Sequence, residues 1–316
     1  MTDPLAHLLA RVHARNVGTR EGELAAYIPE LATVDPDAFG LALVTTDGVV
    51  VTAGDADREF TIQSISKPLV HAMALEDRGR DTVLRHVGVE PSGDAFNAIV
   101  MDPASGLPYN PMVNAGAIAI AGLVAGPDPA GRVLDRISAA AGRRLGVDAA
   151  VLASERRTGH RNRAIAHLLR NAGVIGEGVD AILELYFLQC SIRVTARDLA
   201  TIGATLANLG TNPCTGEDVF RPGDVRDVLA VMLTCGMYDY SGAWVLRVGI
   251  PAKSGVGGGV LGVVNRQLGI GTFSPRVDRR GNSVRGIAAC MEIADELGLH
   301  LFDPLNAGSS FLRALV

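Results

Sequence analysis

The distribution of strand-like and helix-like segments along the chain is the feature that most constrains its fold. Strand-like runs lie near both ends of the chain, at residues 39–54, 243–250, 259–264 and 267–273. Between the two groups, from about Ser64 to about Met237, the pattern is mainly helical. If both groups join one sheet, the fold is α/β, with an antiparallel sheet flanked by helices and an inserted all-helical subdomain.

This arrangement predicts the domain boundaries and the position of an active site. Residues 1–66 and 241–316 would form the α/β sheet subdomain, and residues 67–240 the helical subdomain. Ligand sites often lie where such layers meet. We therefore expect one catalytic unit with its active site at the junction.

Composition and charge exclude several classes of protein. The chain has 316 residues, and 29 basic against 34 acidic side chains leave a net charge of −5, which disfavours nucleic acid as a partner. The most apolar run, Ala115 to Gly126, is shorter than the roughly 18 to 20 residues that cross a membrane. It is typical of a buried helix, and no membrane association is expected.

The compartment can also be predicted from the sequence. Asp3 and Arg11 lie where a signal peptide would need an apolar centre. The four cysteines are far apart and form no C-x-x-C pair, which disfavours a zinc site or a redox motif. We expect a reduced, cytoplasmic protein.

Lysine is almost absent from the chain, and both lysines lie in short motifs. Only Lys67 and Lys253 occur among the 29 basic residues. A buried lysine can lose its proton, whereas an arginine cannot, so these two positions are candidates for chemistry that needs a neutral amine.

The first lysine ends an S-x-x-K motif, Ser64-Ile-Ser-Lys67. Pro68 is compatible only with the first turn of a helix, so we expect Ser64 at a helix N-terminus with Lys67 on the same face. Backbone N–H groups there are available to an oxyanion. The motif alone is short enough to arise by chance.

The second lysine begins Lys253-Ser-Gly on a predicted strand. An early S-x-x-K and a late K-[ST]-G are the signature pair of serine β-lactamases and penicillin-binding proteins. The pair therefore favours an acyl-serine hydrolase with a serine β-lactamase-like fold. The third element of that signature, S-D-N or Y-x-N, is not evident; residues 238–242 contain a phenol but no matching asparagine.

Longer motifs resemble the serine-dependent glutaminase family, from about Tyr27 to Phe302. They are Gln63-Ser-Ile-Ser-Lys-Pro, Glu90-Pro-Ser-Gly, Asn110-Pro-Met-Val-Asn-Ala-Gly-Ala-Ile, Gly159-His-Arg-Asn-Arg-Ala, Cys235-Gly-Met-Tyr-Asp-Tyr-Ser-Gly and Pro251-Ala-Lys-Ser-Gly-Val. The resemblance implies hydrolysis of the γ-carboxamide of L-glutamine through an acyl-serine intermediate. It also implies a homodimer or homotetramer, and such amide hydrolysis needs no cofactor or metal.

The resemblance also implies roles for individual residues. Ser64 would be the nucleophile and Lys67 its base, with Tyr27 and Tyr238 lining the catalytic centre. The N–H groups of Ser64 and Val256 would hold the oxyanion.

Four further residues match the family's contacts to the amino acid end of the substrate. Glu155 would hold the α-ammonium, although its sequence context alone favours a solvated charge in a loop. Asn114, Asn162 and Tyr186 would contact the α-carboxylate. Asn114 could also cap a helix.

Two other functions remain open at this stage. A penicillin-recognising hydrolase or peptidase would share the fold but would need export. A sensor of glutamine or glutamate would share the pocket but would not need the Ser64 and Lys67 pair.

Overall fold

The computed structural model describes residues 4–26, 28–94 and 98–303. Its helices are α1 (Pro4–Asn16), α2 (Ser66–Arg78), α3 (Arg80–Leu84), α4 (Asn114–Ala121), α5 (Pro129–Ala141), α6 (Ala149–Thr158), α7 (His160–Asn171), α8 (Val179–Cys190), α9 (Ala196–Ala207), α10 (Pro222–Cys235), α11 (Ser241–Arg247) and α12 (Val284–Leu297). Its strands are β1 (Glu23–Leu24), β2 (Gly40–Thr45), β3 (Val50–Gly54), β4 (Phe60–Thr61), β5 (Gly146–Val147), β6 (Ile192–Val194), β7 (Ala252–Ser254), β8 (Gly259–Val264), β9 (Leu268–Phe273) and β10 (Arg276–Val277). Short 3-10 helices are η1 (Pro29–Thr33), η2 (Gln63–Ile65) and η3 (Tyr238–Tyr240).

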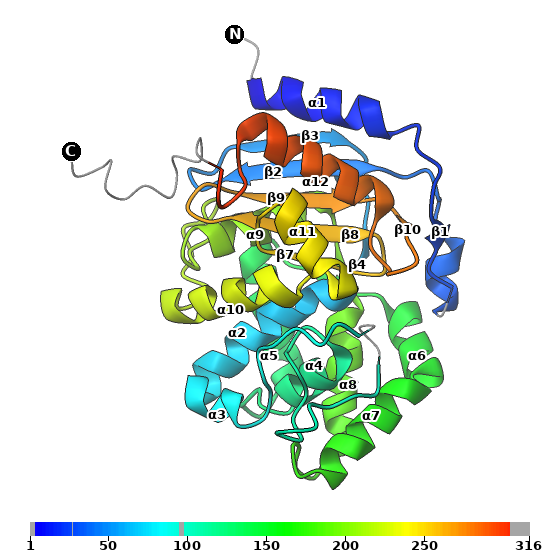
Figure 1. Ribbon diagram of the computed structural model, residues 1–316, viewed down its shortest axis with the longest axis vertical. Coiled ribbons are helices and arrows are strands. Elements are labelled where there is room, and N and C mark those ends of the chain that lie inside the picture. The colour runs from blue at the N-terminus through cyan, green and yellow to red at the C-terminus, as the bar shows by residue number, and fades with distance from the viewer. Residues whose placement is uncertain (1–3, 27, 95–97, 304–316) are drawn as a thin grey trace, which may run out of the picture.

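Strands from both ends of the chain join one antiparallel sheet, as predicted. Its strand order is β3-β2-β9-β8-β7, and every neighbouring pair is antiparallel. β2 and β3 form the expected hairpin, and Gly48 in its turn has φ of +86°, which favours glycine. Helices α1 and α12 lie over one side of this sheet, while α4 to α8 gather away from it (Figure 1).

Side chains of β2 point alternately to the two faces of the sheet, and each face packs against helices. Leu41 and Leu43 pack in the apolar cluster that includes side chains of α1 and α12. Ala42 and Val44, which point to the opposite face, pack against α9. Both faces are therefore buried, which accounts for the nearly continuous apolar run that predicts this strand.

Helix α9 lies unusually close to β9. A Cβ atom added at Gly269 would lie 2.1 Å from the carbonyl oxygen of Ala200, and one added at Gly271 would lie 2.0 Å from that of Ala196. Only glycine allows this approach. Helix α9 belongs to the segment 67–240, so one helix of that segment packs directly on the sheet. The division into two subdomains stays a prediction.

Gly271→Ala is expected to lower the free energy of unfolding by about 1–3 kcal/mol, because the added methyl group must push α9 away from β9. Gly223→Ala on α10 is the matched control. Nothing lies within 4 Å of its added Cβ atom, and alanine favours a helix, so stability should stay equal or rise. Chemical denaturation of both variants measures the difference. Equal stability of the two variants would contradict the close α9–β9 contact.

One predicted strand is wrong. Residues 243–250 contain helix α11 (Ser241–Arg247) instead of a strand. The buried side chains of Ser241, Trp244 and Val248 recur at helical spacing, whereas Leu246 is 80% exposed. Burial on one helical face therefore outweighs the strand propensity of valine and tryptophan. Trp244 lies in the core, on helix α11.

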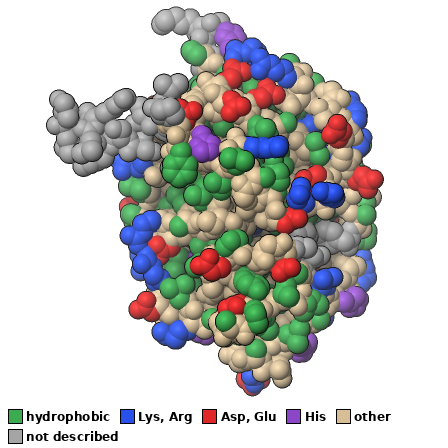
Figure 2. All heavy atoms as spheres, viewed as in Figure 1, with side chains coloured by type: hydrophobic (Ala, Val, Ile, Leu, Met, Phe, Trp, Pro, Cys, Tyr) green, Lys and Arg blue, Asp and Glu red, His purple; other side chains and the backbone are tan. Residues whose placement is uncertain are grey.

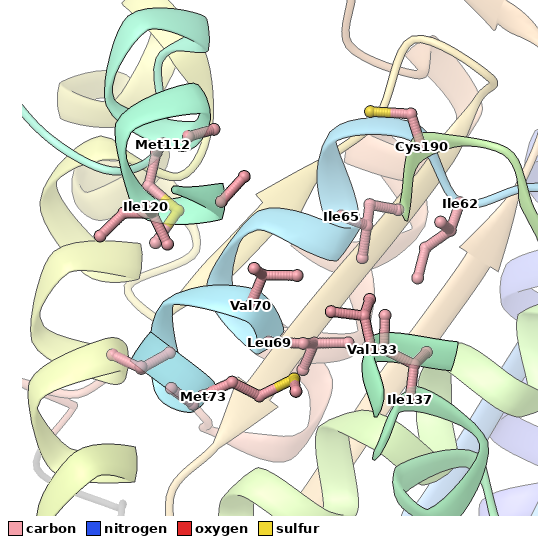
Figure 3. Close-up of a cluster of buried hydrophobic side chains, with 14 of the residues drawn as sticks. Ile62, Ile65, Leu69, Val70, Met73, Met112, Ile120, Val133, Ile137 and Cys190 are labelled. Carbon is pink, nitrogen blue, oxygen red and sulfur yellow. The ribbon is translucent and has the colours of Figure 1, made fainter. Parts of the chain in front are cut away.

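Helix α2 forms the centre of the helical region. Every residue from Ser66 to Leu75 is buried. Leu69 and Met73 belong to the same cluster as Val133 and Ile137 of α5 (Figure 3). The residues at the start of α2 are thereby held inside the molecule and not at its surface.

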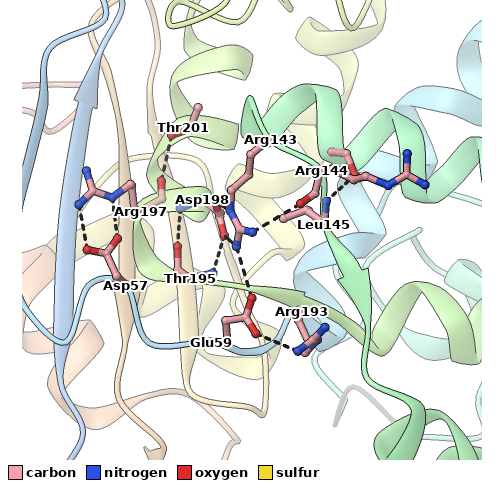
Figure 4. A network of polar contacts seen from close by, with 11 residues as sticks. Asp57, Glu59, Arg143, Arg144, Leu145, Arg193, Thr195, Arg197, Asp198 and Thr201 are labelled. Atoms are coloured by element: carbon pink, nitrogen blue, oxygen red, sulfur yellow. Dashed lines mark hydrogen bonds and ion pairs between the residues drawn. The ribbon is translucent and has the colours of Figure 1, made fainter.

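A polar network fixes the start of α9 (Figure 4). Thr195 and Asp198 form a capping box, in which each side chain accepts a backbone N–H of the other residue. The guanidinium of Arg143 donates two hydrogen bonds to Asp198, at 2.7 and 2.6 Å. Arg197 pairs with Asp57 near the sheet. These contacts tie α9 to both the helices and the strands.

The apolar run at 115–126 forms much of α4, whose residues are all buried, as predicted. No helix within the described residues is long and apolar enough to cross a membrane. On the face seen in Figure 2, acidic and basic side chains are interspersed.

Candidate active site

Ser64 lies in the 3-10 helix η2, directly before α2. Lys67 and Pro68 occupy the first turn of α2, and Ser64 lies at the N-terminal end of that helix, as the sequence predicts. Gln63 has φ of +51°, which is rare for a residue with a side chain, so the turn is strained.

Ser64 lines a cavity of about 200 Å³. The described residues around this cavity are Gln63, Ser64, Asn114, Glu155, Thr158, Gly159, Arg161, Asn162, Tyr186 and Cys190. Five of the residues predicted for the site, from segments far apart in the sequence, therefore meet here.

Lys67 is buried beside this cavity, and its amine is directed to two acceptors. Its Nζ donates to the carbonyl oxygen of Met112 at 3.2 Å and to Oδ1 of Asn114 at 2.7 Å. Burial lowers the pKa of Lys67 to about 8, and the charges of Cys190 and Glu155 partly oppose this shift. A neutral amine is therefore accessible near physiological pH.

Tyr238 brings a phenol to Ser64. It lies in η3 with φ of +57°, a second strained conformation at the site. Its hydroxyl donates to the carbonyl oxygen of Ser254 at 3.0 Å. Burial raises the pKa of Tyr238, and a hydrogen bond with Ser64 partly offsets this rise. The phenol is therefore protonated at neutral pH and lies within hydrogen-bonding reach of Ser64.

Glu155 is buried in the wall of the cavity and belongs to α6, so the alternative of a solvated loop residue is wrong. Burial raises its pKa to about 7, and the nearby charge of Lys67 opposes the rise. A carboxylate in such a site has few partners of its own and favours a cationic ligand.

The side chain of Asn114 forms hydrogen bonds with both Lys67 and Asn162 at the cavity. Besides accepting from Lys67, it donates through Nδ2 to Oδ1 of Asn162 at 3.0 Å. The alternative role as a helix cap is wrong, because Val113 occupies that position and Asn114 is already helical. The bond leaves Nδ2 of Asn162 as a donor for a ligand. Tyr186 of α8 lines the same cavity.

Val256 follows β7 and lies alongside η2. A Cβ atom added at Gly255 would lie 2.9 Å from the carbonyl oxygen of Ile62, and one added at Gly257 would lie 2.9 Å from that of Thr61. The glycines on both sides of Val256 thus let its backbone approach the segment that carries the candidate nucleophile. Tyr27 lies outside the described residues.

Several residues at the site could not be identified from the sequence as parts of it. Cys190, Thr158 and Gly159 line the cavity without any chemical signal in the sequence. Gln63 and Arg161 flank predicted residues, which is the only sequence signal for them.

Ser66 lies next to Lys67 in the chain, and its hydroxyl has two partners elsewhere. Its hydroxyl donates to the carbonyl oxygen of Gln63 at 2.8 Å and accepts from Nε2 of Gln189 at 3.2 Å. The carbonyl oxygen of Ser254 accepts a hydrogen bond from Nζ of Lys253.

Size alone does not identify the site. A cavity of about 870 Å³ lies beside α5, but the three arginines that line it are each paired with a carboxylate: Arg132 with Asp77, Arg136 with Glu76 and Arg221 with Asp224. Within the described residues, no three His, Cys, Asp or Glu side chains gather in a way that could hold a metal ion.

The comparison with known families decides the identity. Residues 22–302 match the family model described as Glutaminase. The chain belongs to the glutaminase family. A glutaminase from Nostoc sp. is 51% identical over 309 residues, which cover 97% of this chain and 92% of that relative.

Solved structures of glutaminases agree with this assignment. The structure of Mglu in its glutamate form has a TM-score of 0.92 at 46% identity, covering 96% of this chain and 71% of that one. The probable glutaminase from Bacillus subtilis complexed with 6-diazo-5-oxo-L-norleucine has a TM-score of 0.87 at 34% identity, covering 96% and 97%. The predicted family, the β-lactamase-like fold and the enzyme class, a glutaminase, are confirmed.

Proposed function

We propose that this glutaminase hydrolyses the γ-carboxamide of L-glutamine to L-glutamate and ammonia through an acyl-serine intermediate on Ser64. The observation that carries the proposal is a buried serine next to a buried lysine with a lowered pKa, beside a cavity with a buried carboxylate. A lysine that is neutral near pH 8 can accept the proton of a nucleophilic serine.

In the acylation step, Ser64 Oγ attacks the γ-carbonyl carbon while its proton passes to Lys67 Nζ. The tetrahedral oxyanion accepts hydrogen bonds from the N–H groups of Ser64 and Val256. The position of Gly255 and Gly257 against the chain that enters η2 supports the role of Val256. The C–N bond then breaks, the leaving nitrogen takes up a proton, and ammonia departs, leaving a γ-glutamyl ester on Ser64.

In the deacylation step, water attacks the ester, loses its proton to a base at the site, and returns Ser64 to its free form. Tyr238 passes protons in one of the two half-reactions, and its reach to Ser64 supports this role. Tyr27 is proposed at the catalytic centre on the family resemblance alone.

The cavity walls account for recognition of an amino acid. Glu155 pairs with the α-ammonium, and Asn114, Asn162 and Tyr186 contact the α-carboxylate. The cavity, about 200 Å³, is smaller than typical drug-sized sites, which supports a single amino acid over a β-lactam or a peptide. The Mglu structure in its glutamate form and the Bacillus subtilis complex with an L-norleucine derivative support the same class of ligand.

We expect kcat/KM to rise with pH. Below about pH 7 Glu155 is protonated and cannot pair with an ammonium, and below about pH 8 Lys67 is protonated and cannot act as a base. Both groups are therefore active in their deprotonated forms, so kcat/KM at pH 6 should be at least about tenfold lower than at pH 8. Initial rates between pH 5.5 and 9 measure the profile. A flat profile would contradict both assignments.

Glu155→Gln is expected to raise KM for L-glutamine at least about tenfold, because the ammonium loses its ionic partner. The carboxylate also raises the pKa of Lys67, so its removal should move the rise of kcat to lower pH. Thr158→Ala, on the same cavity wall, provides a control that changes no charge. An unchanged KM in Glu155→Gln would show that Glu155 does not bind the ammonium.

The activity is tested by measuring ammonia and glutamate released from L-glutamine by the purified protein. The proposal predicts equal amounts of the two products, and much slower release from L-asparagine. No release from L-glutamine, but turnover of a chromogenic β-lactam, would instead support the penicillin-recognising alternative. Ligand binding without release would support a sensor.

Two broader properties, the oligomeric state and the compartment, are part of the proposal. The resemblance supports a homodimer or homotetramer, which light scattering at several concentrations can check. The four cysteines are all free, which supports a reducing compartment such as the cytoplasm. Fractionation of the source cells tests this assignment.

A further inference from the structure

Lys253, one of the two lysines in the chain, has no role in the mechanism so far. It lies in the middle of β7 and is fully buried. Among the described residues that line the 200 Å³ cavity, Lys253 does not occur. Its place in the β-lactamase-like signature therefore does not by itself make it a substrate contact.

The amine of Lys253 has three acceptors. Nζ donates to the carbonyl oxygens of Gly236 at 2.9 Å and Ser254 at 2.7 Å, and it lies 4.2 Å from the centre of the Tyr238 ring. Two carbonyl groups and an aromatic face match the three N–H groups of an ammonium. Burial and the charge of Lys67 lower the pKa of Lys253. The two carbonyl oxygens and the ring favour the protonated amine.

Tyr238 needs support from its surroundings because its backbone is strained. Its φ of +57° is stabilised by Ser241, whose Oγ donates to the Tyr238 carbonyl oxygen at 2.9 Å and accepts from the Met237 N–H at 3.1 Å. The Tyr238 hydroxyl donates to the same Ser254 carbonyl oxygen that Lys253 contacts. Lys253 therefore contacts three groups around Tyr238. It donates to the backbone of Gly236, which precedes Tyr238, and to the Ser254 carbonyl oxygen, which also accepts from the Tyr238 hydroxyl, and its amine lies over the Tyr238 ring.

We propose that Lys253 is a positioning residue, which holds the phenol of Tyr238 against Ser64 and does not bind the substrate. The inference rests on the proposed role of Tyr238 in proton transfer. Without the lysine, the Ser254 carbonyl oxygen and the ring each lose a partner. The phenol then leaves the position from which it reaches Ser64.

Lys253→Met tests the proposal, because methionine keeps most of the volume but removes the donors. We expect kcat to fall about 100-fold, as is typical when a general acid or base is misplaced, while Ki for L-glutamate changes less than about twofold. Lys253→Gln, which keeps a donor, should have an intermediate kcat, and it provides the test if Lys253→Met does not fold. A rise in Ki that parallels the loss of kcat in either variant would overturn the proposal, because it would make Lys253 a substrate contact.

Trp244→Phe is the matched control. It removes another fully buried donor near β7, the Nε1 group that bonds to the carbonyl oxygen of Ile250 at 2.7 Å. It should lower the melting temperature but leave kcat within about twofold, since the hydrogen bond of Trp244 goes to Ile250 and not to Lys253 or Ser254. A loss of kcat as large as that of Lys253→Met would show that any damage near β7 has the same effect, and would overturn the proposal.

A double-mutant cycle with Tyr238→Phe separates this inference from the proposed function. If Lys253 acts through Tyr238, Lys253→Met should lower kcat less than about threefold in the Tyr238→Phe background. The full loss in that background would overturn the inference while leaving Tyr238 in its role. An unchanged kcat in Tyr238→Phe alone would instead overturn the proton-transfer role of Tyr238, on which the inference rests.

Discussion

Ser64→Ala is expected to lower kcat for L-glutamine hydrolysis by at least about 10⁴-fold, because the variant has no oxygen to form the γ-glutamyl ester. Binding of L-glutamate should remain within a few-fold of the wild type. The reason is that Glu155, Asn114 and Asn162, which we propose bind the amino acid end, line the cavity and are not changed. The result would separate an enzyme from a sensor that shares the pocket.

The neighbouring serine provides the control for this variant. Ser66 lies two residues further along the chain, but its hydroxyl donates to the Gln63 carbonyl oxygen instead of lining the cavity. Ser66→Ala should keep far more activity than Ser64→Ala. Ammonia release by both variants, together with calorimetric binding of L-glutamate, measures the contrast. Release by Ser64→Ala at more than about one hundredth of the wild-type rate would contradict a covalent role for Ser64.

Lys67→Met is expected to lower kcat by about 10³- to 10⁴-fold, since the variant has no base for the Ser64 proton. The dependence of kcat on a group with a pKa of about 8 should disappear. The bonds from Lys67 to Met112 and Asn114 are also lost, so the side chain of Asn114 should bind L-glutamate somewhat more weakly.

The same variant allows a test of the lowered pKa that does not depend on activity. Lys67 has a pKa of about 8 in the folded protein, against an ordinary lysine value of 10.5 in the unfolded chain, so between these values the unfolded chain binds more protons than the folded one. Stability of the wild type should therefore rise relative to Lys67→Met as pH increases from about 8 to 10.5. Denaturant unfolding at several pH values measures the difference. A constant difference would mean that burial does not shift this pKa.

The arrangement of the sheet could be predicted because its strands have strong local signals. Residues 39–54 contain two largely apolar runs on either side of an Asp47-Gly48 turn, and residues 259–273 are largely apolar and rich in valine and glycine. The segment that became α11 has similar residues, and its conformation is decided by which side chains are buried. That depends on contacts of Trp244 with distant parts of the chain, which no local pattern contains.

Site residues that occur in sequence motifs could be predicted. Properties that depend on tertiary packing, such as burial and backbone strain, could not. Ser64 and Lys67 are three residues apart, so their chemistry is evident in the sequence. Glu155 has the appearance of a surface residue beside two arginines, and its burial follows from the packing of α6 against α8. The strained φ angles of Gln63 and Tyr238 likewise arise from tertiary contacts.

The central claim is that L-glutamine is hydrolysed through a γ-glutamyl ester on Ser64. It is tested most directly by mixing the protein with excess L-glutamine, quenching with acid within milliseconds, and examining the peptides by mass spectrometry. The account predicts a γ-glutamyl group on the peptide that contains Ser64, lost when the quench is delayed until substrate is exhausted, and absent from Ser64→Ala. A γ-glutamyl group on another residue, or none during a turnover limited by deacylation, would contradict it.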